Sequence, residues 1–212
     1  MALATVSDLR TSVSDWLARS DLSDALINDL ILLAEARMNR DLRINLLERR
    51  ASLNTTAGDG YISLPTDSGG TVDATEVRKL SYVSSPSYEP LQFATPGTIS
   101  FRRYEGLTGK PVVYSIVGTE FQLAPIPDAI YELRCTYLAK LAALSDSNTT
   151  NDILTNHPDL YLFGVLAEAE PYTGFDERRQ LWESKYQACL AAARSADNRL
   201  KYNGAPLVER AG

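Results

Sequence analysis

The spacing of apolar residues changes along the chain, and this change constrains the fold more than any other feature. Between residues 24 and 41, and again between 182 and 193, apolar residues recur at the three- and four-residue intervals of one helix face. Between Tyr131 and Leu138, apolar and polar residues alternate as in a strand with one buried face. The sequence therefore predicts helices at both ends of the chain and β-structure in its middle.

Two helices are predicted at the N-terminal end. The first begins after Ser7 as its N-cap. The second spans Asp24 to Asp41, and Leu26 and Leu33 widen its apolar stripe, so we expect it to pack on more than one side. The apolar face of the first helix consists of Leu9, Val13, Trp16 and Leu17.

Two further helices are predicted near the C-terminal end. Asn156 is the expected cap of the first, with Pro158 in its opening turn and Pro171 at its end. Thr173 is the expected cap of the second, which should end near residues 197–200. The apolar stripe of this last helix consists of Trp182, Tyr186, Cys189, Leu190 and Ala193.

The middle of the chain contains short apolar runs separated by Gly, Pro and Ser, a pattern typical of strands and turns. Residues 84–90 are expected to form a loop, and residues 95–101 a single helical turn. Strands are predicted at 47–55, 61–64, 74–83, 111–117, 121–124 and 131–138.

Together these elements predict an α+β protein that is mainly α. The N- and C-terminal helix pairs should form a four-helix bundle because their apolar stripes have no other helices to meet. The bundle comprises residues 1–45 and 152–200, and a β-rich subdomain, residues 46–145, is inserted into it. Residues 201–212 form an extended C-terminal tail.

The net charge of -6 and the pI of about 4.9 disfavour nucleic-acid binding through the whole surface. No stretch of about 18 apolar residues predicts a transmembrane helix, and residues 1–10 lack the pattern of a signal peptide. Cys135 and Cys189 show no spacing typical of a disulfide framework or a zinc site, so we expect both to be reduced, as in cytoplasm.

No motif predicts catalysis. His157, the one histidine, has no nucleophile elbow to serve and is expected to be a surface or capping residue. Glu168 and Glu170 are close in sequence but point about 200° apart on a helix. We therefore predict no catalytic, cofactor-binding or metal site, and a protein that is not an enzyme.

The C-terminal tail carries apolar residues on a segment too short to fold alone. Leu200, Tyr202, Leu207 and Val208 lie in or next to residues 201–212. Such a segment is either disordered or docked on another chain, and we favour docking.

The stretch from Gly109 to Arg194 resembles the head-to-tail adaptor proteins of tailed bacteriophages. The resemblance rests on the order of four segments and on Trp182 and Tyr186 in the final helix. The segments are GKPVVYSI (109–116), FQLAPIPD (121–128), LRCTYLAKL (133–141) and NDILTNHPDLYLFGVLAEA (151–169). The resemblance implies a helical bundle with a β-rich insertion, assembled as a ring, usually of twelve copies, beneath the portal.

The first hypothesis is thus a structural virion protein, assembled in the host cytoplasm, that joins the portal to the tail tube, nozzle or a further connector. Its tail would dock on the portal through Leu200, Tyr202, Leu207 and Val208, and DNA would pass through the ring without specific binding. No membrane partner and no cofactor is expected. Two alternatives stay open: a virion-associated peptidoglycan hydrolase that uses carboxylates, and a soluble binding module unrelated to phage.

Overall fold

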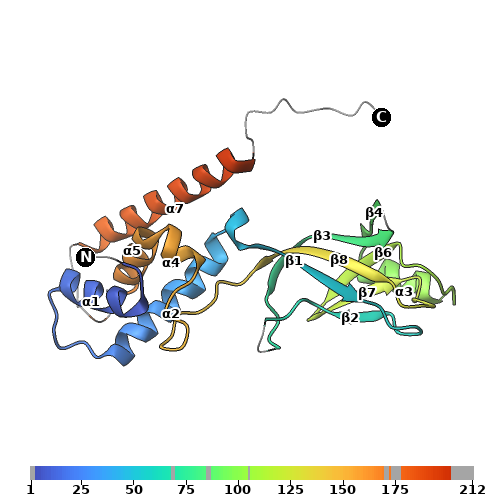
Figure 1. Cartoon of the computed structure of the whole chain (residues 1–212), viewed down its shortest axis with the longest axis horizontal. Helices are drawn as coiled ribbons and strands as arrows, with labels where there is room; N and C mark the ends of the chain where they lie inside the picture. Colours follow the sequence, from blue (N-terminus) through green and yellow to red (C-terminus); the bar gives the residue numbers. More distant parts are fainter. Residues whose placement is uncertain are drawn as a thin grey trace. The chain divides into compact units, whose positions relative to one another are not determined.

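The computed structural model describes residues 3–67, 70–84, 87–104, 106–169, 172 and 178–201. The chain divides into two compact units (Figure 1). The described residues of Met1–Leu47 and Leu141–Gly212 form the first, here called the helical unit. Glu48–Lys140 forms the second, the β unit.

Three helices of the helical unit, α1 (Val6–Leu17), α2 (Asp24–Asp41) and α4 (Asp152–Asn156), begin where a polar side chain binds a free backbone N–H group. Thr5, not Ser7, caps α1: its hydroxyl accepts a hydrogen bond from the Asp8 N–H, and the Asp8 carboxylate accepts one from the Thr5 N–H. Ser23 caps α2, which has the predicted bounds. The elements are α1 (Val6–Leu17), α2 (Asp24–Asp41), the 3₁₀ turn η1 (Asn45–Leu47), α4 (Asp152–Asn156), α5 (Pro158–Glu168) and α7 (Arg179–Lys201).

Helix α5 is the centre of this unit, because it packs against α1, α2, α4 and α7. Gly164 of α5 allows the close approach of its neighbours. A Cβ atom at this position would lie 3.3 Å from Met38 of α2 and 3.4 Å from Tyr186 of α7. Both neighbouring side chains are buried, so a side chain at 164 would require Met38 or Tyr186 to shift.

The β unit contains two four-stranded sheets, in the orders β1-β8-β3-β4 and β2-β7-β6-β5. All strand pairs are antiparallel except β5 with β6. The strands are β1 (Glu48–Asn54), β2 (Tyr61–Ser63), β3 (Ala74–Ser84), β4 (Ser87–Pro90), β5 (Gln92–Phe93), β6 (Val113–Val117), β7 (Glu120–Ala124) and β8 (Glu132–Ala139).

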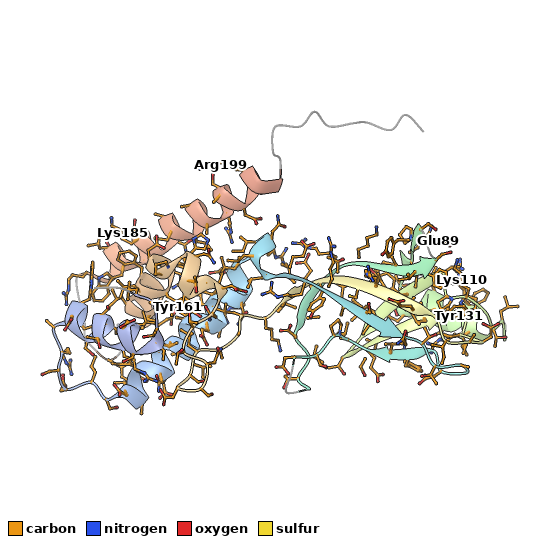
Figure 2. The ribbon with its side chains drawn as sticks, in the orientation of Figure 1. Glu89, Lys110, Tyr131, Tyr161, Lys185 and Arg199 are labelled. Atoms are coloured by element: carbon orange, nitrogen blue, oxygen red, sulfur yellow. The ribbon has the colours of Figure 1, made fainter. Side chains whose placement is uncertain are left out.

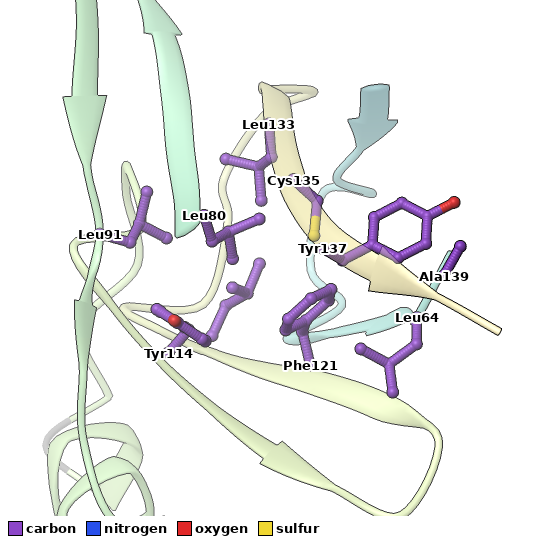
Figure 3. Packing of buried hydrophobic residues seen from close by; sticks show 10 residues of the cluster. Leu64, Leu80, Leu91, Tyr114, Phe121, Leu133, Cys135, Tyr137 and Ala139 are labelled. Carbon is purple, nitrogen blue, oxygen red and sulfur yellow. The ribbon is translucent and has the colours of Figure 1, made fainter. Parts of the chain in front are cut away.

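Side chains from both sheets form one apolar core in the β unit (Figure 3). Leu133 and Cys135 of β8 are fully buried, as their alternation predicts, and Phe121 of β7 is buried with them. Helix α3 (Pro96–Tyr104) is fixed to the second sheet by Arg103, whose guanidinium donates to the carbonyls of Leu123 and Gly60.

The prediction of a mainly α protein built on a four-helix bundle is wrong. Eight strands in two sheets form a whole compact unit, and six α-helices lie in the described part of the chain. The short helix α4, which Asn151 caps, was not predicted, and Asn156 is its last residue and not the cap of the next helix. Pro158 starts the separate helix α5, as predicted, because it has no N–H to continue α4, and His157 is the N-cap of α5. The predicted single turn after Thr95 is the nine-residue α3, and the predicted loop at 84–90 contains β4.

Two residues assigned to apolar helix faces are not buried. Trp16 is 48% exposed, and its ring meets the edge of Phe163 at a centroid distance of 5.8 Å. Cys189 is half-buried, whereas Trp182, Tyr186 and Leu190 of the same helix are buried. Thr173, the predicted cap of the last helix, and Pro171 lie outside the described residues.

Candidate assembly surface

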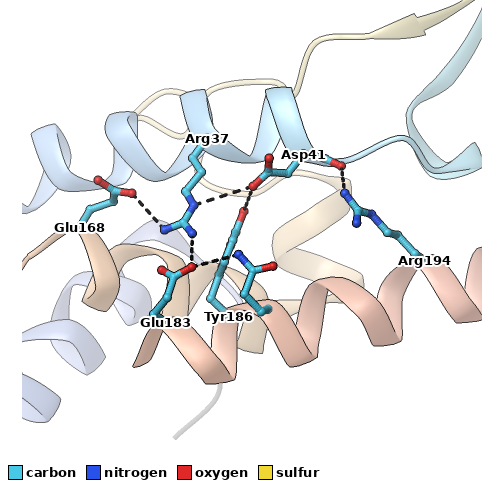
Figure 4. Close-up of polar contacts among 7 residues, drawn as sticks. Arg37, Asp41, Glu168, Glu183, Tyr186 and Arg194 are labelled. Carbon is cyan, nitrogen blue, oxygen red and sulfur yellow. Dashed lines mark hydrogen bonds and ion pairs between the residues drawn. The ribbon is translucent and has the colours of Figure 1, made fainter. Parts of the chain in front are cut away.

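A cluster of charged side chains joins three helices of the helical unit (Figure 4). The guanidinium of Arg37 on α2 donates to Glu183 of α7 at 2.5 Å and to Glu168 of α5 at 3.4 Å. Its Nε lies 3.8 Å from the Asp41 carboxylate, and its carbon lies 4.2 Å from the centre of the Tyr186 ring. We call these five residues the Arg37 cluster.

The Arg37 cluster aligns α7 with α2 and α5. The Tyr186 hydroxyl donates to the Asp41 carboxylate at 3.1 Å, and burial, together with this carboxylate, raises the pKa of Tyr186. The hydroxyl therefore stays protonated and remains a donor at neutral pH. Because the Glu183 side chain is 41% exposed, water screens its attraction to Arg37, and the main effect of the cluster is to fix the geometry of α7.

A second polar network lies deeper among the helices. Glu35 of α2 is only 3% exposed, and its Oε1 accepts hydrogen bonds from the Leu144 N–H at 2.8 Å and the Tyr161 hydroxyl at 3.0 Å. Tyr161 in turn accepts one from Asn151 at 2.6 Å. Burial raises the pKa of Glu35 above its usual value. This network holds the connection between β8 and α4 against α2 and α5.

The buried face of α7 ends at Asp197 in the described part of the chain. This residue is 7% exposed, and its carboxylate accepts a hydrogen bond from the Asn45 N–H at 2.6 Å. One turn earlier, Arg194 donates to the Asp41 carbonyl at 2.6 Å. The next two residues, Asn198 and Arg199, are exposed, so Asp197 is the last anchor of α7 that the structure describes.

The four predicted docking residues follow this anchor. Leu200 lies in the final turn of α7, and its side chain is outside the described residues. Tyr202, Leu207 and Val208 lie wholly outside the described residues. Their role in docking stays a prediction.

The residues considered for catalysis are not brought together. Among the described residues, no three His, Cys, Asp or Glu side chains are grouped as metal ligands. Glu168 is engaged by Arg37, Glu170 lies outside the described residues, and His157 stands at the start of α5 without a capping hydrogen bond. Burial raises the pKa of Cys135 to about 12, which disfavours the nucleophilic thiolate.

Sequence reasoning missed the Arg37 cluster. Arg37 and Asp41 are four residues apart on α2, a spacing that allows an ion pair and could have been noticed. Glu168 and Glu183 come from distant segments, and no local pattern indicates that they share one arginine. Within the described ranges, no helix is long and apolar enough to cross a membrane.

Comparison with known proteins identifies the family. The model of the SU10 adaptor protein family matches residues 4–210, which is nearly the whole chain. No curated protein matches the chain. The chain therefore belongs to the SU10 adaptor protein family and is a structural adaptor of a phage virion, as its resemblance to head-to-tail adaptors predicts.

Proposed function

We propose that this protein is a head-to-tail adaptor that assembles as a ring beneath the portal and joins the portal to the tail. Membership in an adaptor family supports this proposal. In it, Leu200, Tyr202, Leu207 and Val208 dock on the portal protein, and the copies come together on the portal in the host cytoplasm. The β unit, Glu48–Lys140, is left to meet the tail tube, the nozzle or a further connector.

The observation that carries the proposal is the end of the buried stripe of α7. Trp182, Tyr186, Leu190, Ala193 and Asp197 are buried in their own subunit, whereas Asn198 and Arg199 are exposed. The chain then continues with four large apolar residues among residues 200–208. Burial of such side chains on a partner favours the complex because it removes apolar surface from water.

The Arg37 cluster contributes to docking indirectly. By holding α7 against α2 and α5, it fixes the position of the helix that residues 202–212 follow in the sequence. A segment that starts from a fixed base loses less freedom when it binds, so less of the docking energy is spent on ordering.

The net charge of -6 fits a channel through which DNA passes without specific binding. Phosphates are bound mainly by Lys and Arg, and an acidic chain offers few phosphate contacts over its whole surface.

Portal rings from the same phage provide the test. The wild-type protein should co-sediment with the rings, and a variant that ends at Asp197 should bind about tenfold or more weakly. A full-length variant with Leu200, Tyr202, Leu207 and Val208 changed to Ser should behave like the truncation.

A matched control replaces the polar tail residues Asn203 and Glu209 by Ser and should bind as the wild type does. Circular dichroism verifies that each variant is folded. Equal binding of the truncation and the wild type would show that the tail does not dock on the portal.

A further inference from the structure

Helix α2 is apolar on two opposite faces, and only one of them is buried in the described structure. Ile27, Leu30, Ile31, Ala34 and Met38 are buried on the inner face. On the opposite side, Leu32 is 59% exposed and Leu33 is 48% exposed. We call this side the α2 outer face; it consists of the exposed residues Ala25, Asp29, Leu32, Leu33, Ala36 and Arg40.

Single exposed leucines are common on protein surfaces, but two adjacent ones beside an alanine form a continuous apolar strip. Such a strip, opposite a helix's buried face, is typical of a helix that packs on two sides. Helix α2 touches α7 of its own subunit through Arg37 and Asp41, so α7 does not cover Leu32 or Leu33.

Helix α7 also has an exposed face, which points away from its buried stripe. Its exposed residues recur at intervals of three and four, and Leu181, 55% exposed, begins the series. We call this side the α7 outer face; it consists of Leu181, Lys185, Ala188, Ala192, Ser195 and Arg199. Alanine and serine let another helix approach closely, and Lys185 and Arg199 both belong to this face (Figure 2).

The two outer faces differ in charge. Asp29 is the acid of the α2 outer face and lies one turn before Leu33, while Arg40 is at the far end of that face. The α7 outer face carries only cations among its described side chains, and Lys185 lies one turn before Ala188. When the two helices run parallel with Asp29 beside Lys185, equal rise per residue brings Leu33 beside Ala188 and Ala192.

We propose that the α2 outer face of one copy packs against the α7 outer face of the next copy in the ring. This inference rests on the proposed function, because it names the contact between neighbours that a ring needs. The leucines of α2 lie on the alanines of α7, and Asp29 pairs with Lys185.

The contact is head-to-tail, since it joins two different faces of the same protein. A face that binds a copy of itself closes into a dimer, whereas two different faces leave one of each free for further copies. A closed ring forms when the rotation that relates one copy to the next returns to the first copy after a whole number of steps. The same two helices thus form both the subunit and its contacts with both neighbours.

The test measures how many adaptor copies each portal ring carries, by mass photometry of portal–adaptor complexes. The double variant Leu32→Ser/Leu33→Ser keeps the tail and should still bind portal rings. Because neighbouring copies of this variant no longer stabilise one another on the portal, the ring should fill only at about tenfold higher adaptor concentration than with the wild type. The control Phe101→Ser/Ile130→Ser changes two apolar residues of the β unit that are even more exposed, and should fill the ring at the wild-type concentration.

A second set of variants checks the pairing itself and does not depend on removing apolar residues. Asp29→Lys and Lys185→Asp should each reduce filling of the ring, and the combined variant should restore it, because the pair then has its charges exchanged. Tryptophan fluorescence of the free proteins verifies that the helical unit is folded.

The outcomes separate the inference from the proposed function. If wild-type protein does not bind portal rings at all, the proposed function fails. If wild-type protein fills the ring and the leucine variant fills it at the same concentration, the contact proposed here is wrong while the adaptor function stands. If the combined variant Asp29→Lys/Lys185→Asp fills the ring no better than the single variants do, the Asp29–Lys185 pairing is also contradicted.

Discussion

The interiors of the two units are stabilised by different kinds of contact. The core of the β unit lies between two sheets and is formed by apolar side chains such as Phe121, Leu133 and Cys135. In the helical unit, charged residues also belong to the interior. Among the described residues, the two buried carboxylates, Glu35 and Asp197, both lie there, and each accepts hydrogen bonds from the backbone.

The two kinds of contact have different effects: apolar contacts mainly stabilise a unit, whereas polar contacts mainly fix how its elements are placed. Apolar contacts are non-directional and stabilise any arrangement that excludes water, so alternation and volume suffice to specify the sheets. Hydrogen bonds and ion pairs depend on direction and distance. The Arg37 cluster and Asp197 therefore specify how α7 lies on α2 and α5, and α7 is the helix from which the proposed docking tail extends.

The largest expected loss of stability comes from a substitution that destabilises the β unit and leaves the helical unit unchanged. Phe121→Ala should destabilise the β unit by about 3–5 kcal/mol, because it leaves a cavity in the core between the sheets. Both tryptophans, Trp16 and Trp182, lie in the helical unit. In a denaturant titration, circular dichroism should therefore show an early transition that tryptophan fluorescence does not.

The control for this prediction is Phe101→Ala, which removes a ring that is 67% exposed and should change stability by less than about 0.5 kcal/mol. Equal shifts of both signals in Phe121→Ala would show that the two units unfold as one.

The next effect weakens the helical unit alone. Arg37→Ala removes the cation that Glu168, Glu183 and Asp41 share, and should cost about 1–2 kcal/mol because the partners are partly exposed. Tryptophan fluorescence should report the loss. Arg40→Ala changes an exposed arginine of the same helix and should have little effect. Equal losses in both variants would mean that the cluster adds nothing specific.

A smaller effect tests the start of α1. Thr5→Ala removes the capping hydroxyl and should destabilise the helical unit by about 1 kcal/mol. Ser7→Ala is the matched control, because Ser7 lies inside the first turn of α1 and does not cap it. The same fluorescence titration applies, and a larger loss in the Ser7 variant would move the cap back to the position that the sequence favours.

The smallest effect concerns pH. Burial raises the pKa of Glu35, so folding favours its protonated form. The stability that this residue contributes is present below its unfolded pKa and is lost as the pH rises through the folded pKa. Glu35→Gln keeps the acceptor for Leu144 and Tyr161 but never ionises.

The stability of the Glu35→Gln variant relative to the wild type should thus increase as the pH rises above the ordinary pKa of a glutamic acid, about 4.3. Urea titrations followed by tryptophan fluorescence at several pH values measure this. A difference that stays constant across the range would show that Glu35 does not ionise within it.

The sequence predicts single elements of this fold better than their combination. The buried face of α2 and the buried side of β8 follow from spacing alone, because period determines which residues share a face. The caps predicted at Ser7 and Asn156 were wrong, since several polar residues stand near each helix start and only the backbone conformation decides which one caps. Strands β4 and β5 were not predicted because they are too short to show a period.

For the candidate site, the sequence indicated the apolar tail and the buried stripe of α7. It did not indicate the Arg37 cluster or the solvent exposure of Leu32 and Leu33, because both depend on where distant segments meet. The widened stripe of α2 predicted packing on more than one side, and within the described structure only one side is packed.

The first and last strands of the β unit, β1 and β8, pair with each other, with Glu48 opposite Leu138. The entry and exit of the inserted segment are therefore separated by about 4.8 Å, the spacing of adjacent strands. A module with such closely spaced ends can be exchanged for another of different size, or for a short turn, without altering the helical unit into which it is inserted. On this basis the β unit can change in evolution while the helices of the other unit stay the same.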